Sequence, residues 1–153
     1  MTSKETGRVL AVDVGRVRVG LAVSDPDRLI ASPLATYERQ DPTRDADYFR
    51  TLAVEEKIQR IVVGLPVHLD GREGDKARES RAFGDWLVKV IGLPVSYYDE
   101  RFSTVEAEKA LWAAGLTHRR RKDRRDRVAA QIFLQAYLDA GCPEEESPGA
   151  LDR

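Results

Sequence analysis

The sequence has 153 residues, of which 42% are hydrophobic and 33% charged, a composition typical of one globular domain with a substantial core. No apolar run approaches the ~20 residues of a membrane-spanning helix, and the first residues lack the apolar stretch of a secretory signal, so we expect a cytoplasmic protein that does not contact membranes. One cysteine and two histidines exclude cysteine-rich and histidine-rich metal sites, so any bound metal must be a hard cation held by carboxylates.

The first forty residues predict three antiparallel strands. The apolar runs 8–14 and 18–25 are separated by a short turn that contains Gly15. A second turn leads to 29–37, where Pro33 favours an edge strand because proline cannot donate to the hydrogen-bond ladder.

Helical periodicity then alternates with short apolar strands. Asp41 is a candidate N-cap for the first helix, and Pro42 follows it. The expected elements are a helix from 42 to Ile58, a strand at 60–66, a helix at 76–91, a strand at 94–100, a helix from Ser103 or Thr104 to Gly115, and a helix at about 124–140.

This order predicts an α/β protein with a mixed five-stranded sheet, in which three antiparallel strands precede two parallel ones and helices cover both faces. That is the topology of the RNase H-like fold. We expect residues 1–140 to form this single domain and residues 141–153 to form a flexible acidic tail.

Three carboxylates stand where hydrophobic residues are expected. Asp13 interrupts an apolar strand, where a lone buried acid is costly, although it could instead cap the following turn. Asp99 and Glu100 end the fifth strand, and because side chains alternate, only one can face Asp13. Alternation alone does not say which of the two this is; alternatively both are solvent-exposed and one pairs with Arg101.

The third carboxylate, Asp126, lies on the same helix face as Ala130, Phe133 and Tyr137, which is the apolar face. Acids from two strands and a helix suit a phosphodiester hydrolase that uses two metal ions. Mg²⁺ or Mn²⁺ is expected because these ions accept carboxylate and water oxygens as ligands.

The net charge is −1, but the charge is unevenly distributed. The tail 141–153 carries −3, which leaves +2 on the rest of the chain, and residues 118–127 contain seven Lys or Arg and two Asp. Such blocks are typical of surfaces that bind nucleic-acid phosphates, although a solvated helix start gives the same composition. The candidate substrate-binding residues are Arg18, Arg101, Arg119, Arg120, Arg121, Lys122, Arg124 and Arg125.

Four segments together resemble the YqgF/RuvX family of RNase H-like nucleases: AVDVGRVRVGLAVSD, IVVGLPVHLDGREG, YYDERFSTVEAE and DRVAAQIFLQAYLD. The resemblance spans about residues 8–140 and implies a nuclease that matures the 16S ribosomal RNA precursor or resolves Holliday junctions. It also implies that the metal-binding acids are Asp13, Glu100 and Asp126. Asp123 could be an auxiliary ligand, a helix N-cap or a partner of the neighbouring arginines.

Two other functions fit parts of this pattern. Asp-x-Gly before a β-hairpin also opens the ATP-binding lobes of sugar kinases, chaperones and actin, but those proteins enclose the nucleotide between two lobes. A catalytically silent nucleic-acid-binding module gains nothing from clustered acids beside phosphates. Cleavage of a junction would need two active sites, hence a homodimer, whereas trimming of RNA ends needs one.

Overall fold

The computed structural model describes the backbone of residues 6–102 and 118–144, and the side chains of residues 6–101 and 127–144. Within these residues a five-stranded sheet has the strand order β3-β2-β1-β4-β5. The strands are β1 (Arg8–Val14), β2 (Arg18–Ser24), β3 (Ala31–Glu38), β4 (Ile58–Leu65) and β5 (Val95–Asp99). The first three pair antiparallel, whereas β4 pairs parallel with β1 and β5 parallel with β4, which confirms the expected mixed sheet.

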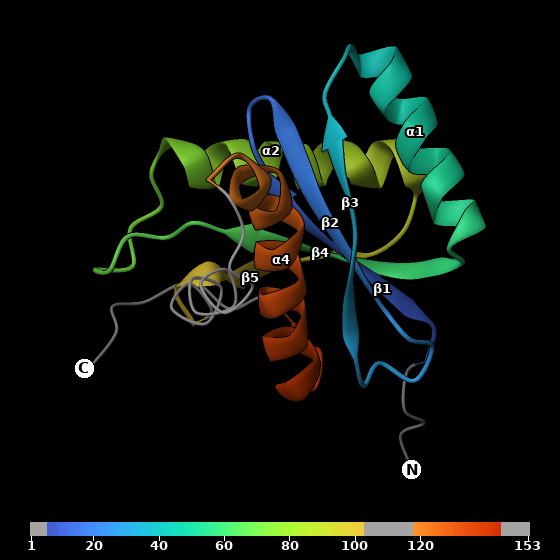
Figure 1. Ribbon diagram of the computed structural model, residues 1–153. Helices are drawn as coiled ribbons and strands as arrows, with labels where there is room; N and C mark the ends of the chain where they lie inside the picture. Colours follow the sequence, from blue (N-terminus) through green and yellow to red (C-terminus); the bar gives the residue numbers. More distant parts are fainter. Residues whose placement is uncertain (1–5, 103–117, 145–153) are drawn as a thin grey trace.

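Helices cover both faces of this sheet, as Figure 1 shows. They are α1 (Pro42–Glu55), α2 (Asp75–Ile91) and α4 (His118–Asp139), and a short 3₁₀ helix, η1 (Glu100–Phe102), follows β5. The helices α1 and α2 contact each other on one face, and α4 crosses the other face over β1, β2 and β3.

The alternation of side chains along the strands divides the core into two layers. On the α1 and α2 side the core contains Leu10, Val12, Leu21, Phe49, Ile61, Val63 and Phe83. On the α4 side it contains Val9, Ala11, Ala22, Val62, Ala130, Phe133 and Tyr137. Each strand position is therefore assigned to a face, and this assignment decides which polar side chains can meet.

The edge position predicted for the strand with Pro33 is confirmed, because β3 is the outermost strand next to β2. Ala35 pairs with Leu21 and Pro33 with Ala22, so Leu34 is an extra residue at a β-bulge. The irregularity accommodates a residue that cannot donate to the ladder.

The start of α1 also follows the prediction, but its end does not. The Asp41 side chain accepts a hydrogen bond from the Arg44 backbone nitrogen at 2.9 Å, and Pro42 is the first helical residue. The helix ends at Glu55, because Lys57 adopts a positive φ of 53° and Ile58 already begins β4.

The helix α4 starts at His118, earlier than the expected start near residue 124. Arginine and lysine favour helices, so the basic block at 118–127 extends α4 toward its amino terminus. The block lacks the periodic apolar residues that mark the remainder of the helix. Asp123 therefore lies inside the helix, which excludes the N-cap role considered for it. The helix expected between Ser103 and Gly115, and residues 145–153 of the expected tail, lie outside the described residues.

No helix among the described residues has the length and apolar content required to cross a bilayer.

Candidate active site

Asp13 lies near the carboxyl end of β1, the central strand of the sheet. Val9 and Ala11 pack toward α4, so the alternation of side chains directs Asp13 to the α4 side. Its partner across the antiparallel ladder is Gly20 of β2. Because glycine has no side chain, this neighbour leaves space beside the carboxylate.

Glu100 comes to the same side of the sheet from η1. In β5, Tyr97 points toward α2, where its hydroxyl donates to Asp85 Oδ1 at 2.7 Å, and Tyr98 points toward α4, where its ring contacts Tyr137. Continuing this alternation places Glu100 on the α4 side, and its carboxyl group makes a hydrogen bond with Asp13. The structure thus brings together two of the three predicted acids.

The environment of Glu100 favours its protonated form. Burial raises the pKa of the Glu100 carboxyl above its usual value, the hydrogen bond with Asp13 opposes that rise, and the nearby charge of Asp99 adds to it. Two carboxyl groups held this close repel each other when both are ionised. A positive charge placed between them would relieve this repulsion.

Gly64 provides the space that the Glu100 side chain occupies. A Cβ atom at Gly64 would lie 2.9 Å from both Cγ and Cδ of Glu100 and closer still to Oε1. From the sequence, Gly64 is only one residue of the strand expected at 60–66. An isolated glycine inside an apolar strand also indicates the close approach of another group, and that signal would have pointed to this position.

Replacement of Gly64 with Ala is therefore expected to destabilise the protein and to displace the Glu100 carboxyl. Overpacking of this kind costs about 1–3 kcal/mol. For a chain of this length each kcal/mol lowers the melting temperature by roughly 2–4 °C. In a Glu100→Ala background the same replacement should cost little, because the clashing side chain is gone. Equal losses of melting temperature in both backgrounds would contradict the packing of Glu100 against Gly64.

Asp99 is directed away from Asp13 and pairs with Arg101. Its Oδ1 accepts from the Arg101 backbone nitrogen at 2.9 Å, and its Oδ2 accepts from Arg101 Nε at 2.7 Å. Both side chains are largely buried, with exposed fractions of 12% and 6%. The alternative of two solvent-exposed acids is therefore wrong, although the pairing with Arg101 that it included is present.

Arg101 also fastens the loop that follows β4. Its Nη1 donates to the carbonyl oxygens of His68 and Leu69 at 3.2 and 3.1 Å. A guanidinium group so buried and so fully bonded has little capacity left for a phosphate. Arg101 thus holds η1 and the loop together beside Glu100, and its contact with substrate stays a prediction.

The basic block forms the amino-terminal turns of α4, and the direction of the helix places it near the two acids. Gln131 and Gln135 bond to the backbone of Ala31 and Leu29, at the edge of the sheet opposite Asp13. The preceding residues of α4 therefore run toward the edge where Asp13 and Glu100 lie, and α4 contacts η1.

The side chains of Asp123, Asp126 and the block itself lie outside the described residues; this set is Arg119, Arg120, Arg121, Lys122, Arg124 and Arg125. Arg18 begins β2 and shares the α4 face with Gly20 by alternation, so it remains a candidate for substrate contact. Among the described side chains no group of three or more potential metal ligands occurs, since only Asp13 and Glu100 of the predicted set belong to them.

A family model and two similar proteins point to the same protein family. The family model described as "RuvX: Holliday junction resolvase" matches residues 7–140. A protein of Rhodopirellula baltica is 47% identical over 135 residues, which cover 88% of this chain and 78% of that protein. One of Koribacter versatilis is 39% identical over 142 residues, which cover 93% of each chain. Both relatives are named "Putative pre-16S rRNA nuclease".

Solved structures share the fold at low sequence identity. T. thermophilus RuvC in complex with a Holliday junction substrate superposes with a TM-score of 0.58 at 16% identity, covering 90% of this chain and 98% of that chain. Fowlpox virus resolvase superposes with a TM-score of 0.51 at 13% identity, covering 87% and 97%. These likenesses agree with the RNase H-like topology expected from the sequence.

Proposed function

The chain belongs to the RuvX family, and on that premise we propose that it is a nuclease that hydrolyses nucleic-acid phosphodiester bonds with divalent metal ions. The names of its relatives favour the precursor of 16S ribosomal RNA as substrate, and the family description favours Holliday junctions. Cleavage of either substrate breaks a phosphodiester bond of a nucleic-acid backbone.

The observation that carries this proposal is the pairing of Asp13 with Glu100 at the carboxyl edge of the central strands. The pair is made of oxygen donors, which Mg²⁺ and Mn²⁺ prefer as ligands. Burial, and to a lesser extent the charge of Asp99, raises the pKa of Glu100, so a cation bound beside this carboxyl group would favour its ionised form. A hard divalent cation would accept these oxygen atoms as ligands and would neutralise the negative charge of the two ionised carboxylates.

In this proposal Asp13, Glu100 and Asp126 hold the metal ions. Bound there, a pair of Mg²⁺ or Mn²⁺ ions would activate water and neutralise charge that develops on the phosphate. Other residues of the chain hold the Glu100 carboxyl group in position. Gly64 leaves room for the Glu100 side chain, and the pair of Asp99 with Arg101 holds the turn that carries it.

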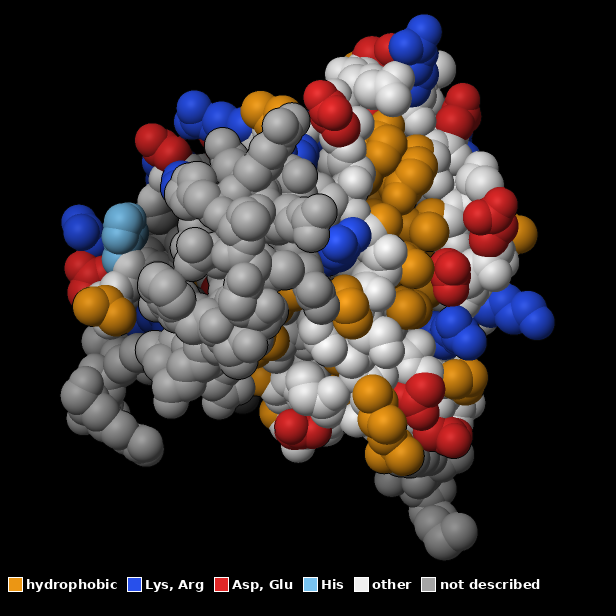
Figure 2. Space-filling model, viewed as in Figure 1, with side chains coloured by type: hydrophobic (Ala, Val, Ile, Leu, Met, Phe, Trp, Pro, Cys, Tyr) orange, Lys and Arg blue, Asp and Glu red, His pale blue; other side chains and the backbone are white. Residues whose placement is uncertain are grey.

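Binding of the nucleic acid is assigned to the amino-terminal turns of α4. On the face shown in Figure 2 the described Lys and Arg side chains are scattered among Asp and Glu. The described part of this face therefore supports no continuous basic surface, and the seven basic residues within 118–127 are the densest positive charge of the sequence. Their position in α4 supports contact with phosphates next to the two acids.

The test is a cleavage assay after exhaustive chelation, with a precursor 16S rRNA fragment and a four-way DNA junction of matched length. We expect no cleavage by the chelated enzyme, recovery with Mg²⁺ or Mn²⁺, and no recovery with Ca²⁺, which takes more ligands at longer distances. The preferred substrate identifies the physiological reaction. Full cleavage by the chelated enzyme would contradict the metal-dependent mechanism, and tight binding without cleavage under any metal would favour a silent binding module.

A further inference from the structure

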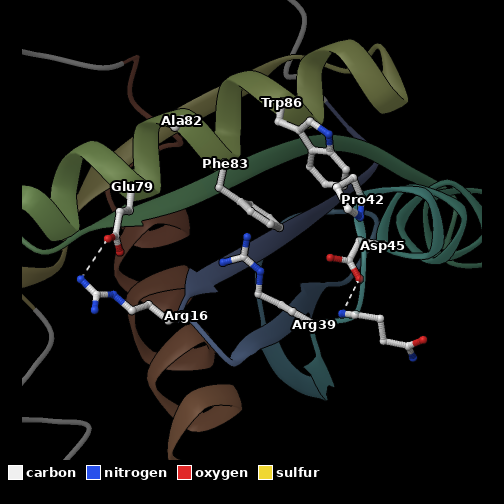
Figure 3. A pocket seen from close by; sticks show the side chains of 9 residues that line it. Arg16, Arg39, Pro42, Asp45, Glu79, Ala82, Phe83 and Trp86 are labelled. Atoms are coloured by element: carbon white, nitrogen blue, oxygen red, sulfur yellow. Dashed lines mark hydrogen bonds and ion pairs between the residues drawn. The ribbon is translucent and has the colours of Figure 1, made fainter.

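A hollow lies on the other face of the sheet from Asp13 and Glu100. It has a volume of about 670 Å³ and is open to solvent. The hairpin between β1 and β2, the end of β3, the start of α1 and the middle of α2 form its walls (Figure 3). The side chains that give it chemical character are Arg16, Arg39, Asp45, Glu79, Phe83 and Trp86.

Asp45 supplies a buried carboxylate to this hollow. The residue is only 6% exposed, and its Oδ1 accepts hydrogen bonds from the Tyr37 hydroxyl at 2.6 Å and from the Gln40 backbone nitrogen at 2.9 Å. Among the described residues, Oδ2 has no hydrogen-bond donor, and Figure 3 shows the carboxylate at the wall that faces Arg39. Oδ2 is thus the oxygen of this carboxylate that is open to the hollow, where it can accept a hydrogen bond from an N–H group of a ligand.

Aromatic and guanidinium groups line the opposite side. Trp86 is half-buried and packs against Phe83 with ring centroids 5.4 Å apart. The guanidinium carbon of Arg39 lies 5.1 Å from the centre of the Phe83 ring. Unpaired bases stack on aromatic rings and on arginine planes, so these groups offer a surface for a base.

Arg16 stands at the mouth of the hollow, where it can meet a phosphate. Its Nη2 lies 3.2 Å from Glu79 Oε1, but the side chains are 79% and 45% exposed. An ion pair so exposed contributes little stability and exchanges readily for another anion. Arginine also binds phosphate oxygens through paired N–H groups.

The hollow and the candidate active site lie at the same end of β1, on opposite faces of the sheet. Arg39 Nη1 donates to the carbonyl oxygen of Gly15 at 2.9 Å, and Gly15 follows Asp13 by two residues. Two residues span at most about 7 Å, so a strand of nucleic acid that crossed the tip of the β1–β2 hairpin would lie within reach of both sites.

We propose that this hollow binds one unpaired nucleotide of the nucleic-acid substrate, with the base stacked on Trp86 and an exocyclic amino group of the base donating to Asp45 Oδ2. The proposal rests on the nuclease function proposed above and narrows its substrate to nucleic acid with unpaired bases near the cleaved bond. Adenine, cytosine and guanine carry the amino group that Asp45 selects, and uracil and thymine lack it.

The test uses the full chain with Trp112 replaced by Phe, so that Trp86 is the only tryptophan. Tetranucleotides of adenylate, cytidylate or uridylate, and a blunt RNA duplex, are titrated in the presence of a chelator that prevents cleavage. We expect adenylate and cytidylate to quench Trp86 fluorescence at concentrations at least about tenfold lower than uridylate. The reason is that only adenine and cytosine can donate a hydrogen bond from an exocyclic amino group to the Asp45 carboxylate. The duplex, whose bases are paired, should not quench.

Asp45→Asn is the decisive variant, because its amide keeps an oxygen for Tyr37 and presents an N–H donor to the hollow. It should lose the preference for adenylate and cytidylate and bind uridylate better. Asp47→Asn, the same change at an exposed position of α1, is the matched control and should leave the preference unchanged. Absence of quenching by any tetranucleotide at millimolar concentration, or an unchanged preference in Asp45→Asn, would overturn the proposal.

Failure of the two proposals can be told apart. The fluorescence experiment needs neither metal nor cleavage, whereas the nuclease proposal is tested by cleavage with metal. Metal-dependent cleavage without nucleotide-induced quenching would remove only the nucleotide subsite. Quenching with the expected base preference, but without cleavage under Mg²⁺ or Mn²⁺, would remove the nuclease function and leave the subsite in place.

Discussion

Replacement of Asp13 with Asn is expected to lower metal-dependent cleavage by on the order of a thousandfold, while the fold persists. A metal ion contributes several kcal/mol of charge stabilisation in such reactions, and each 1.36 kcal/mol is a factor of about ten in rate. The amide has nearly the same volume as the carboxylate, so the packing of β1 should not change. Single-turnover cleavage in Mn²⁺ measures the loss, and circular dichroism checks the fold.

Asp27→Asn is the matched control, because it makes the same chemical change at an exposed residue of the turn between β2 and β3. It should cleave at the wild-type rate. Asp13→Asn should also be at least as stable as the wild type in chelator, since it removes a carboxylate that faces Glu100. Wild-type turnover by Asp13→Asn would show that Asp13 is not a metal ligand.

Replacement of Arg119, Arg120 and Arg121 with Gln is expected to weaken nucleic-acid binding at every sequence. Each phosphate contact releases counterions, so the loss of three contacts should lower the slope of log affinity against log salt by roughly 3. The binding constant is measured by fluorescence anisotropy of a labelled substrate across a range of salt concentrations. Cleavage at saturating substrate should fall much less than affinity does.

A control with the same change in net charge is available elsewhere on the surface. Arg44, Arg50 and Arg78 are exposed on α1 and α2, and their combined replacement with Gln should leave the salt dependence nearly unchanged. If both triple variants lower the slope equally, the effect is one of total charge. If neither does, the basic block is an ordinary solvated helix surface.

Local signals in the sequence predicted most of the fold. The apolar runs located the strands, the Asp41-Pro42 pair located the start of α1, and Pro33 located the edge of the sheet. These features depend on neighbouring residues of the chain, and periodicity records them directly. The start of α4 was predicted too late, because arginine and lysine extend a helix without adding to its apolar period.

Part of the candidate site was also predicted from local signals in the sequence. Asp13 stands out because it interrupts an apolar strand. Pleat alternation indicated that only one of Asp99 and Glu100 can face it, and the family resemblance indicated Glu100. The roles of Gly64 and Arg101 could not be predicted in this way. Each depends on a residue far away in the chain: Gly64 on Glu100, and Arg101 on the carbonyl group of His68.

The sequence by itself thus determined the order of the elements, the face on which each strand residue lies and the acids that stand out from an apolar pattern. The tertiary structure alone decided that Arg101 is committed to Asp99 and the loop, that Gly64 makes room for Glu100, and that Asp45 presents an oxygen to a hollow beside the hairpin. The physical reason is that periodicity reports only whether a side chain is buried. Which partner it meets depends on the distance between atoms that the sheet brings together from distant parts of the chain.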